Sequence, residues 1–174
     1  MKINNNNNNL IEHTLVANYA LNKYLFYREY YFRPYLNSPM NKTTDSTQTQ
    51  LAAACILLSV ADADEILEEQ ELITIAEILK EFFSIDESSV KSLMQNAHEE
   101  WKNSTGLFQF GTQLNQNFSH DDKLDFISCV FEVAYADGEL HYLEHHTVKK
   151  IANILHLDKN ELISAKAEIE SYLD

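Results

Sequence analysis

Apolar residues recur at steps of three and four along most of the second half of this 174-residue chain. This spacing is typical of amphipathic helices that bury one face. Residues 51–61 differ, because they are apolar nearly all round and so predict a helix at the centre of the core. Gly106 and Gly111 predict a short, loosely helical connector. Apolar stripes predict the remaining helices of this half within residues 72–83, 90–101, 124–134, 148–155 and 162–173.

The first 50 residues divide into three stretches of different composition. Residues 1–9 contain six consecutive asparagines and predict a disordered, Asn-rich tail. Residues 10–36 predict an aromatic amphipathic helix, and we expect its stripe within residues 10–35 to dock on a protein partner or on a second copy of the chain. Residues 37–50 are rich in Thr, Ser and Gln and predict a polar linker.

An internal repeat dominates the rest of the chain. Val60-Ala-Asp-Ala-Asp64 is followed by Glu71, and 73 residues later Val133-Ala-Tyr-Ala-Asp137 is followed by Glu144. In each copy an apolar helix ends in Ala-Asp, and a glutamate follows seven positions later. Repetition of this kind predicts two similar structural units within one domain.

Composition supports a helical fold. Only three glycines and two prolines occur in the chain, which disfavours a turn-rich β protein. The sequence therefore predicts an all-α bundle of seven to eight helices, built from two similar helix–acidic turn–helix halves. Ser119 with Asp122, and Asp158 with Glu161, have the spacing of helix N-terminal caps.

Charge and cysteine content narrow the class of protein. The formal net charge is −14, and residues 51–174 carry eight lysines against 24 acids. Such a surface repels phosphate backbones, so we expect no nucleic-acid partner. Cys55 and Cys129 lie in apolar runs and predict buried free thiols. With no signal peptide at Met1 and no apolar run long enough for a membrane span, the sequence predicts a cytoplasmic protein.

The acidic turns allow two interpretations. Asp137-Gly138 suits a helix end, and Glu144 suits the first turn of the next helix, so these residues can serve as caps alone. Alternatively, two packed turns bring together Asp64, Glu71, Asp137 and Glu144, and such carboxylate clusters bind Ca²⁺, Mg²⁺ or Mn²⁺. The first copy has Glu65 in place of Gly138, so the two turns should differ.

Two familiar metal motifs fit the sequence poorly. An EF-hand loop counted from Asp62 would place Ile66 and Ile73 where calcium ligands are required. His141-Tyr-Leu-Glu144-His145 matches the H-x-x-E-H pattern of zinc peptidases, in which both histidines bind zinc and the glutamate is the general base. The first copy of the repeat has no histidines, however, so Glu144 is better explained by the repeat, and no catalytic residue is predicted.

The segment Val133-Ala-Tyr-Ala-Asp-Gly-Glu-Leu-His-Tyr-Leu-Glu144, followed by Ile151-Ala-Asn-Ile-Leu-His-Leu157, resembles the TerB-like family. This family includes the tellurite-resistance TerB domain and domains of some DnaJ-like co-chaperones. The resemblance covers roughly residues 50–170, so residues 51–174 are interpreted as a TerB-like helical domain. It implies a non-enzymatic domain of two similar halves, linked to stress responses, with Asp64, Glu71, Asp137 and Glu144 as metal ligands. The chain has no His-Pro-Asp tripeptide, which a J-domain would require.

The sequence thus predicts a non-enzymatic, acidic helical module that binds a divalent cation and acts through protein partners. The alternative is a purely structural interaction domain, in which the same carboxylates only cap helices.

Overall fold

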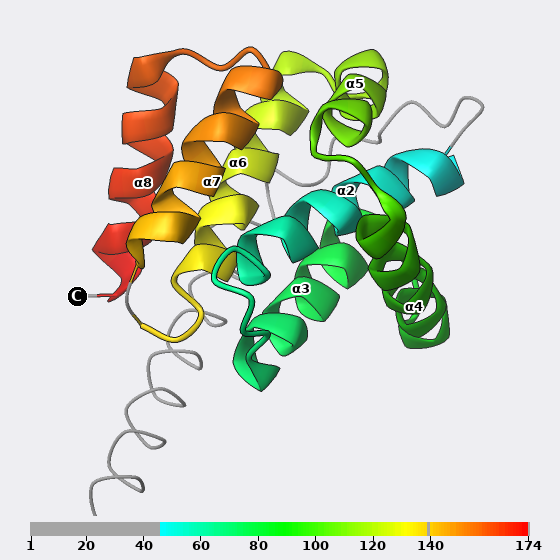
Figure 1. Ribbon diagram of the computed structural model, residues 1–174. Helices are drawn as coiled ribbons and strands as arrows, with labels where there is room; N and C mark the ends of the chain where they lie inside the picture. Colours follow the sequence, from blue (N-terminus) through cyan, green and yellow to red (C-terminus); the bar gives the residue numbers. More distant parts are fainter. Residues whose placement is uncertain (1–45, 139, 174) are drawn as a thin grey trace, which may run out of the picture. The chain divides into compact units, whose positions relative to one another are not determined.

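The computed structural model describes residues 46–138 and 140–173, and within them the chain is entirely helical. Residues 41–169 form one compact unit, and a second unit comprises residues 1–40 and 170–174, of which only the end of the last helix is described. The predicted Asn-rich tail and aromatic helix lie outside the described residues. The helices are α2 (Ser46–Ala61), α3 (Glu69–Phe82), α4 (Glu87–Asn103), α5 (Phe108–Asn117), α6 (His120–Ala134), α7 (Tyr142–Ile154) and α8 (Lys159–Leu173) (Figure 1).

Helix α2 is the centre of the compact unit, as its uniform hydrophobicity predicts. Every residue from Ala52 to Ala61 is buried, and the helix contacts α3, α4, α5, α6 and α7. In Figure 1 it runs through the middle of the compact unit, with α4 on one side and α6 and α7 on the other. A helix that is apolar all round has no face suited to water, so it is stable only when neighbours surround it.

Three of the surrounding helices, α4, α6 and α8, begin at side-chain caps. The Asp86 carboxylate accepts a hydrogen bond from Ser89 N at the start of α4, and the Ser119 hydroxyl accepts one from Asp122 N at the start of α6. Asp158 accepts from Glu161 N before α8, at 3.0 Å. Each cap satisfies a backbone N–H that has no partner inside the helix. The caps predicted at Ser119 and Asp158 are therefore confirmed.

Two boundaries differ from the sequence-based expectation. Helix α2 begins at Ser46, so the last five residues of the predicted linker form its first turns, where Thr49 is buried. The predicted loose connector is instead the regular helix α5. Gly111 is buried in the middle of α5. A side chain at this position would overlap Ile154 Cγ2 of α7, so the close contact of the two helices requires a glycine. This glycine serves close helix packing and does not interrupt the helix.

The repeat in the sequence corresponds to a repeat in the fold. Helices α2 and α3 form one helix–turn–helix pair, α6 and α7 form the other, and α2 contacts both helices of the second pair. The two acidic turns connect the helices of each pair. Among residues 46–138 and 140–173, no helix is long and apolar enough to cross a membrane.

Candidate functional site

The first acidic turn follows the C-terminus of α2. Asp64 Oδ1 accepts a hydrogen bond from Ile66 N at 2.9 Å, which closes a tight turn of the Asx type. Glu65 adopts a φ of +66°, in the left-handed region. Gly138 occupies the equivalent position of the second turn, with a φ of +99°. Both turns therefore require a left-handed residue, although only the second supplies a glycine.

The second acidic turn connects α6 to α7. Asp137 Oδ2 lies 3.1 Å from His141 Nε2, and the two residues form an ion pair when the imidazole is protonated. His141 is also the residue that precedes the first turn of α7. The second turn thus carries an imidazole beside its aspartate, whereas the equivalent residue of the first turn is Glu68.

The two repeat glutamates occupy the same position in their helices. Glu71 Oε2 accepts a hydrogen bond from Glu68 N at 2.9 Å, and Glu144 Oε2 accepts one from His141 N at 2.8 Å. Each bond is the glutamate half of a capping box, which ties the third helical residue to the residue before the helix. Both side chains are buried, with exposed fractions of 5% for Glu71 and 6% for Glu144. Burial of both glutamates was not evident from the sequence.

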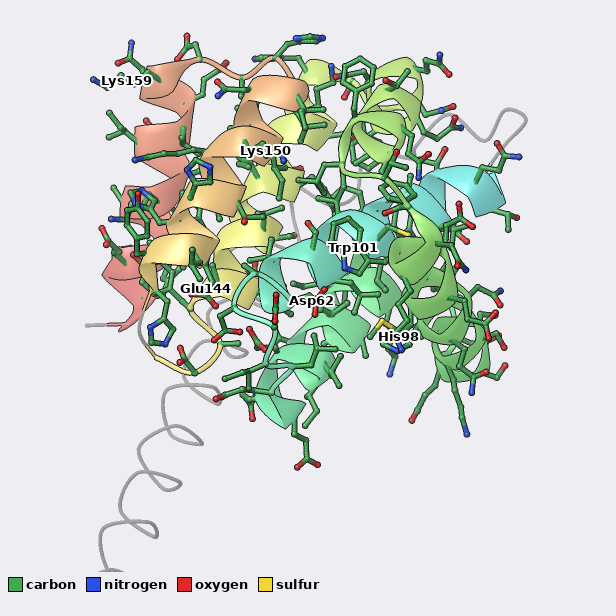
Figure 2. The ribbon with its side chains drawn as sticks, in the orientation of Figure 1. Asp62, His98, Trp101, Glu144, Lys150 and Lys159 are labelled. Atoms are coloured by element: carbon green, nitrogen blue, oxygen red, sulfur yellow. The ribbon has the colours of Figure 1, made fainter. Side chains whose placement is uncertain are left out.

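Burial makes the charged form of these carboxyls unfavourable. Burial raises the pKa of Glu71 to about 7, and the hydrogen bond from Glu68 N opposes this rise. The charges of Glu144, Glu68 and Asp64 raise the pKa further. The pKa of Glu144 is also raised to about 7, first by burial, with Asp137 and Asp64 adding to the rise and His141 opposing it. Asp64 of the first turn therefore acts on both glutamates, and Glu144 of the second copy acts on Glu71 of the first. In Figure 2, Glu144 lies beside the turn that follows α2.

These carboxylates are not assembled as a ready metal site. Among the described residues, no group of three or more His, Cys, Asp or Glu side chains is arranged to hold a metal ion. One oxygen each of Asp64, Glu71 and Glu144 accepts a backbone hydrogen bond from its own turn. A cation in contact with both turns would therefore require the carboxylates to move towards one another.

The histidines near Glu144 do not form the arrangement expected of a zinc peptidase. His141 lies against Asp137, and the Glu144 carboxylate bonds to the His141 backbone at the start of α7. A general base must face a water molecule, whereas this carboxylate is buried in a capping box. Nothing in this geometry favours hydrolysis.

One contact of the first turn could not be foreseen from the sequence. Asp62 Oδ2 accepts a hydrogen bond from the indole Nε1 of Trp101 at 2.8 Å. The two residues are 39 positions apart, and Figure 2 shows the Asp62 and Trp101 side chains next to each other. This bond fixes the end of α2 against α4, so Asp62 has a structural role in the first turn.

Comparison with known proteins identifies the family of this chain. The family model described as Tellurite resistance protein TerB matches residues 50–167. No curated protein and no solved structure matches the chain. The matched segment contains both acidic turns and well over half of the 174 residues. The chain therefore belongs to the TerB family.

Proposed function

We propose that this chain is a non-enzymatic TerB module that binds a divalent cation, Ca²⁺, Mg²⁺ or Mn²⁺, at its two acidic turns. Bound to the cation, it acts through a protein partner in the cytoplasm. The family description, Tellurite resistance protein TerB, supports a role in a stress response of that type. The ligands would be Asp64, Glu71, Asp137 and Glu144.

The observation that carries this proposal is the shared electrostatic environment of the two buried glutamates. Burial is the largest cause of both raised pKa values, Asp64 adds to both, and Glu144 adds to that of Glu71. A cation between these carboxylates would offset the repulsion between their charges. In the described residues, Oε1 of Glu71 and Oε1 of Glu144 accept no hydrogen bond, so each has an oxygen to offer. Hard divalent cations prefer such oxygen ligands.

A partner would have an apolar surface to contact beside these turns. Ile66 in the first turn is 63% exposed, and Tyr142 at the start of α7 is 81% exposed. Ile73 and Leu143 are also exposed on the same two helix starts. These four side chains are the ones we expect a partner to cover, because apolar and aromatic residues are enriched at the centre of protein interfaces. Cation binding that draws the turns together would change how these side chains are presented.

The capping boxes favour a second candidate function. If Glu71 and Glu144 only satisfy the backbone N–H groups of Glu68 and His141, the protein is a structural interaction domain that needs no metal. The two candidates differ in one measurable respect, which is whether a cation stabilises the fold.

Thermal unfolding of the full-length, chelator-treated chain tests the proposal. A ligand at 100 times its dissociation constant stabilises the native state by about 2.7 kcal/mol, which raises the melting temperature by several degrees. We expect this increase with at least one of Ca²⁺, Mg²⁺ and Mn²⁺, and its loss in a Glu71→Gln/Glu144→Gln variant. Glu161→Gln is the matched control, because Glu161 accepts the same kind of capping bond from Asp158 N. Unchanged melting with all three ions would leave only the structural role.

A further inference from the structure

A groove lies between α5 and α7, away from the acidic turns. Its volume is about 810 Å³, which is within the range of pockets that hold small molecules. Residues from the segment before α5, from α5 itself and from the C-terminal half of α7 line it. Gly111 of α5 packs directly against Ile154 of α7, which is one of the lining residues, so the two helices are in close contact beside the groove.

The walls of the groove include apolar groups that face water. Phe108, at the start of α5, has an exposed fraction of 76%, and Ile154 lines the opposite wall. Covering this exposed phenyl ring with a ligand would favour binding, by about 25 cal/mol for each Å² of apolar area removed from water. The groove can therefore bind the apolar part of a ligand.

The charge of the groove is opposite to that of the rest of the domain. Lys150 lines the groove on the side of α7 nearest α5 (Figure 2). His156, just after α7, also lines the groove, and no Asp or Glu is among the lining residues. This contrasts with a chain of net charge −14. A single anionic group is attracted to the Lys150 ammonium, whereas a polyanion such as a nucleic acid is repelled by the surrounding acidic surface.

A buried polar atom beside the groove has no hydrogen-bond partner among the described residues. The Asn115 amide Nδ2 donates to Ile154 O at 2.7 Å, while its Oδ1 is buried and accepts no hydrogen bond from the described residues. Buried acceptors without a donor are rare in folded proteins, because each loses its hydration without compensation. This oxygen is enclosed, so it makes no direct contact with a molecule in the groove; the donated bond to Ile154 O instead joins α5 to α7 beside the groove.

We propose that the groove between α5 and α7 binds a small organic anion with an apolar or aromatic body. The acid group of the ligand pairs with Lys150, and the body covers Phe108 and Ile154. This site is separate from the acidic turns and does not depend on cation binding.

The fluorescent anion 1-anilinonaphthalene-8-sulfonate is a suitable probe, because it combines a sulfonate with an aromatic body. We expect saturable fluorescence enhancement on titration into the folded full-length chain. Lys150→Glu should weaken binding at least about tenfold, since it reverses the charge that holds the sulfonate. Lys149→Glu is the matched control: Lys149 is the adjacent exposed lysine, does not line the groove, and changes the net charge equally.

Two further measurements make the result decisive. Uncharged N-phenyl-1-naphthylamine should bind more weakly than the sulfonate, and Phe108→Ser should weaken both probes. Circular dichroism melting of each variant ensures that binding is compared between folded proteins. Absence of saturable binding would overturn the proposal, as would equal affinities of Lys150→Glu and Lys149→Glu for the sulfonate. Equal affinities of the wild type for the charged and uncharged probes would also overturn it.

Discussion

Glu71 at the start of α3 and Glu144 at the start of α7 have the same capping role, and the charge of Glu144 raises the pKa of Glu71. The two residues come from different copies of the repeat, 73 positions apart. Each copy alone would give a helix cap with a buried carboxyl. The packing of the two copies converts these caps into a pair of mutually unfavourable charges, and this pair is the basis of the proposed cation site.

The stability of the protein should fall as the pH rises from about 5 to about 8. The pKa values of Glu71 and Glu144 rise from 4.5 to about 7 on folding, so the folded state holds their protons more tightly than the unfolded chain does. The contribution of these two groups to the free energy of unfolding is therefore fully present below about pH 4.5 and is lost as the pH rises through about 7. The loss is on the order of 3 kcal/mol per carboxyl at most. Asp125, whose pKa burial raises to about 6, acts in the same direction.

Urea unfolding at several pH values, in the presence of chelator, measures this effect. Glu71→Gln/Glu144→Gln should show a flatter pH profile and should be more stable than the wild type at about pH 8, because glutamine retains an oxygen acceptor without the charge. Identical pH profiles for the variant and the wild type would show that these carboxyls are not the groups responsible.

Glu65→Gly should stabilise the first turn. Glu65 has a left-handed φ of +66°, a conformation that is about 1–2 kcal/mol unfavourable for residues with a Cβ. Glycine relieves this cost in the folded state but also makes the unfolded chain more flexible, which offsets part of the stabilisation. We therefore expect a net stabilisation of about 0.5–1 kcal/mol. Glu65→Ala removes the same charge but retains the Cβ. If the alanine variant is as stable as the glycine variant by urea unfolding, charge and not backbone strain is the cause.

Gly111→Ala should destabilise the contact between α5 and α7. Alanine usually stabilises a helix interior relative to glycine by about 0.5–1 kcal/mol. Here the new methyl group would overlap Ile154 Cγ2, so we expect a net loss of about 1–3 kcal/mol. A double-mutant cycle with Ile154→Ala checks the cause, because removing Cγ2 should relieve most of the loss. Additive effects of the two substitutions would contradict the close-contact explanation.

Asp62→Ala should loosen the end of α2 from α4. It leaves the indole N–H of Trp101 without its acceptor, at a cost of about 1–2 kcal/mol. Trp101 is the only tryptophan in the chain, so its emission reports directly on this contact. Asp62→Asn keeps an oxygen acceptor and should preserve both stability and emission. Equal emission spectra for the wild type and Asp62→Ala would contradict the hydrogen bond.

Much of this fold follows from local sequence patterns. The apolar run of α2 predicts its central position, and Ser119 and Asp158 mark helix starts where the structure has them. Gly138 lies in the turn, beyond the end of α6 at Ala134, and has the predicted left-handed φ. Each of these signals depends only on neighbouring residues. The repeat also identified Glu71 and Glu144 as equivalent, because both copies share the spacing of aspartate and glutamate.

Features that depend on distant packing could not be predicted in this way. The bond between Asp62 and Trp101 joins residues 39 positions apart, and nothing beside either residue indicates its partner. Gly111 predicts a loose connector from the local sequence alone. Its actual role depends on its contact with Ile154, which lies in another helix and 43 positions away. The burial of Glu71 and Glu144, and hence their raised pKa values, likewise results from the packing of the two halves.

Calorimetric titration of Ca²⁺, Mg²⁺ and Mn²⁺ into the chelator-treated full-length chain at about pH 7 tests the cation site most directly. We predict saturable binding of at least one ion, with release of protons, because Glu71 and Glu144 hold part of their protons at this pH and a bound cation displaces them. The same titration of Glu71→Gln/Glu144→Gln should show no binding, while Glu161→Gln should bind as the wild type does. Absence of binding to the wild type, or unchanged binding to the double variant, would contradict a cation site at the acidic turns.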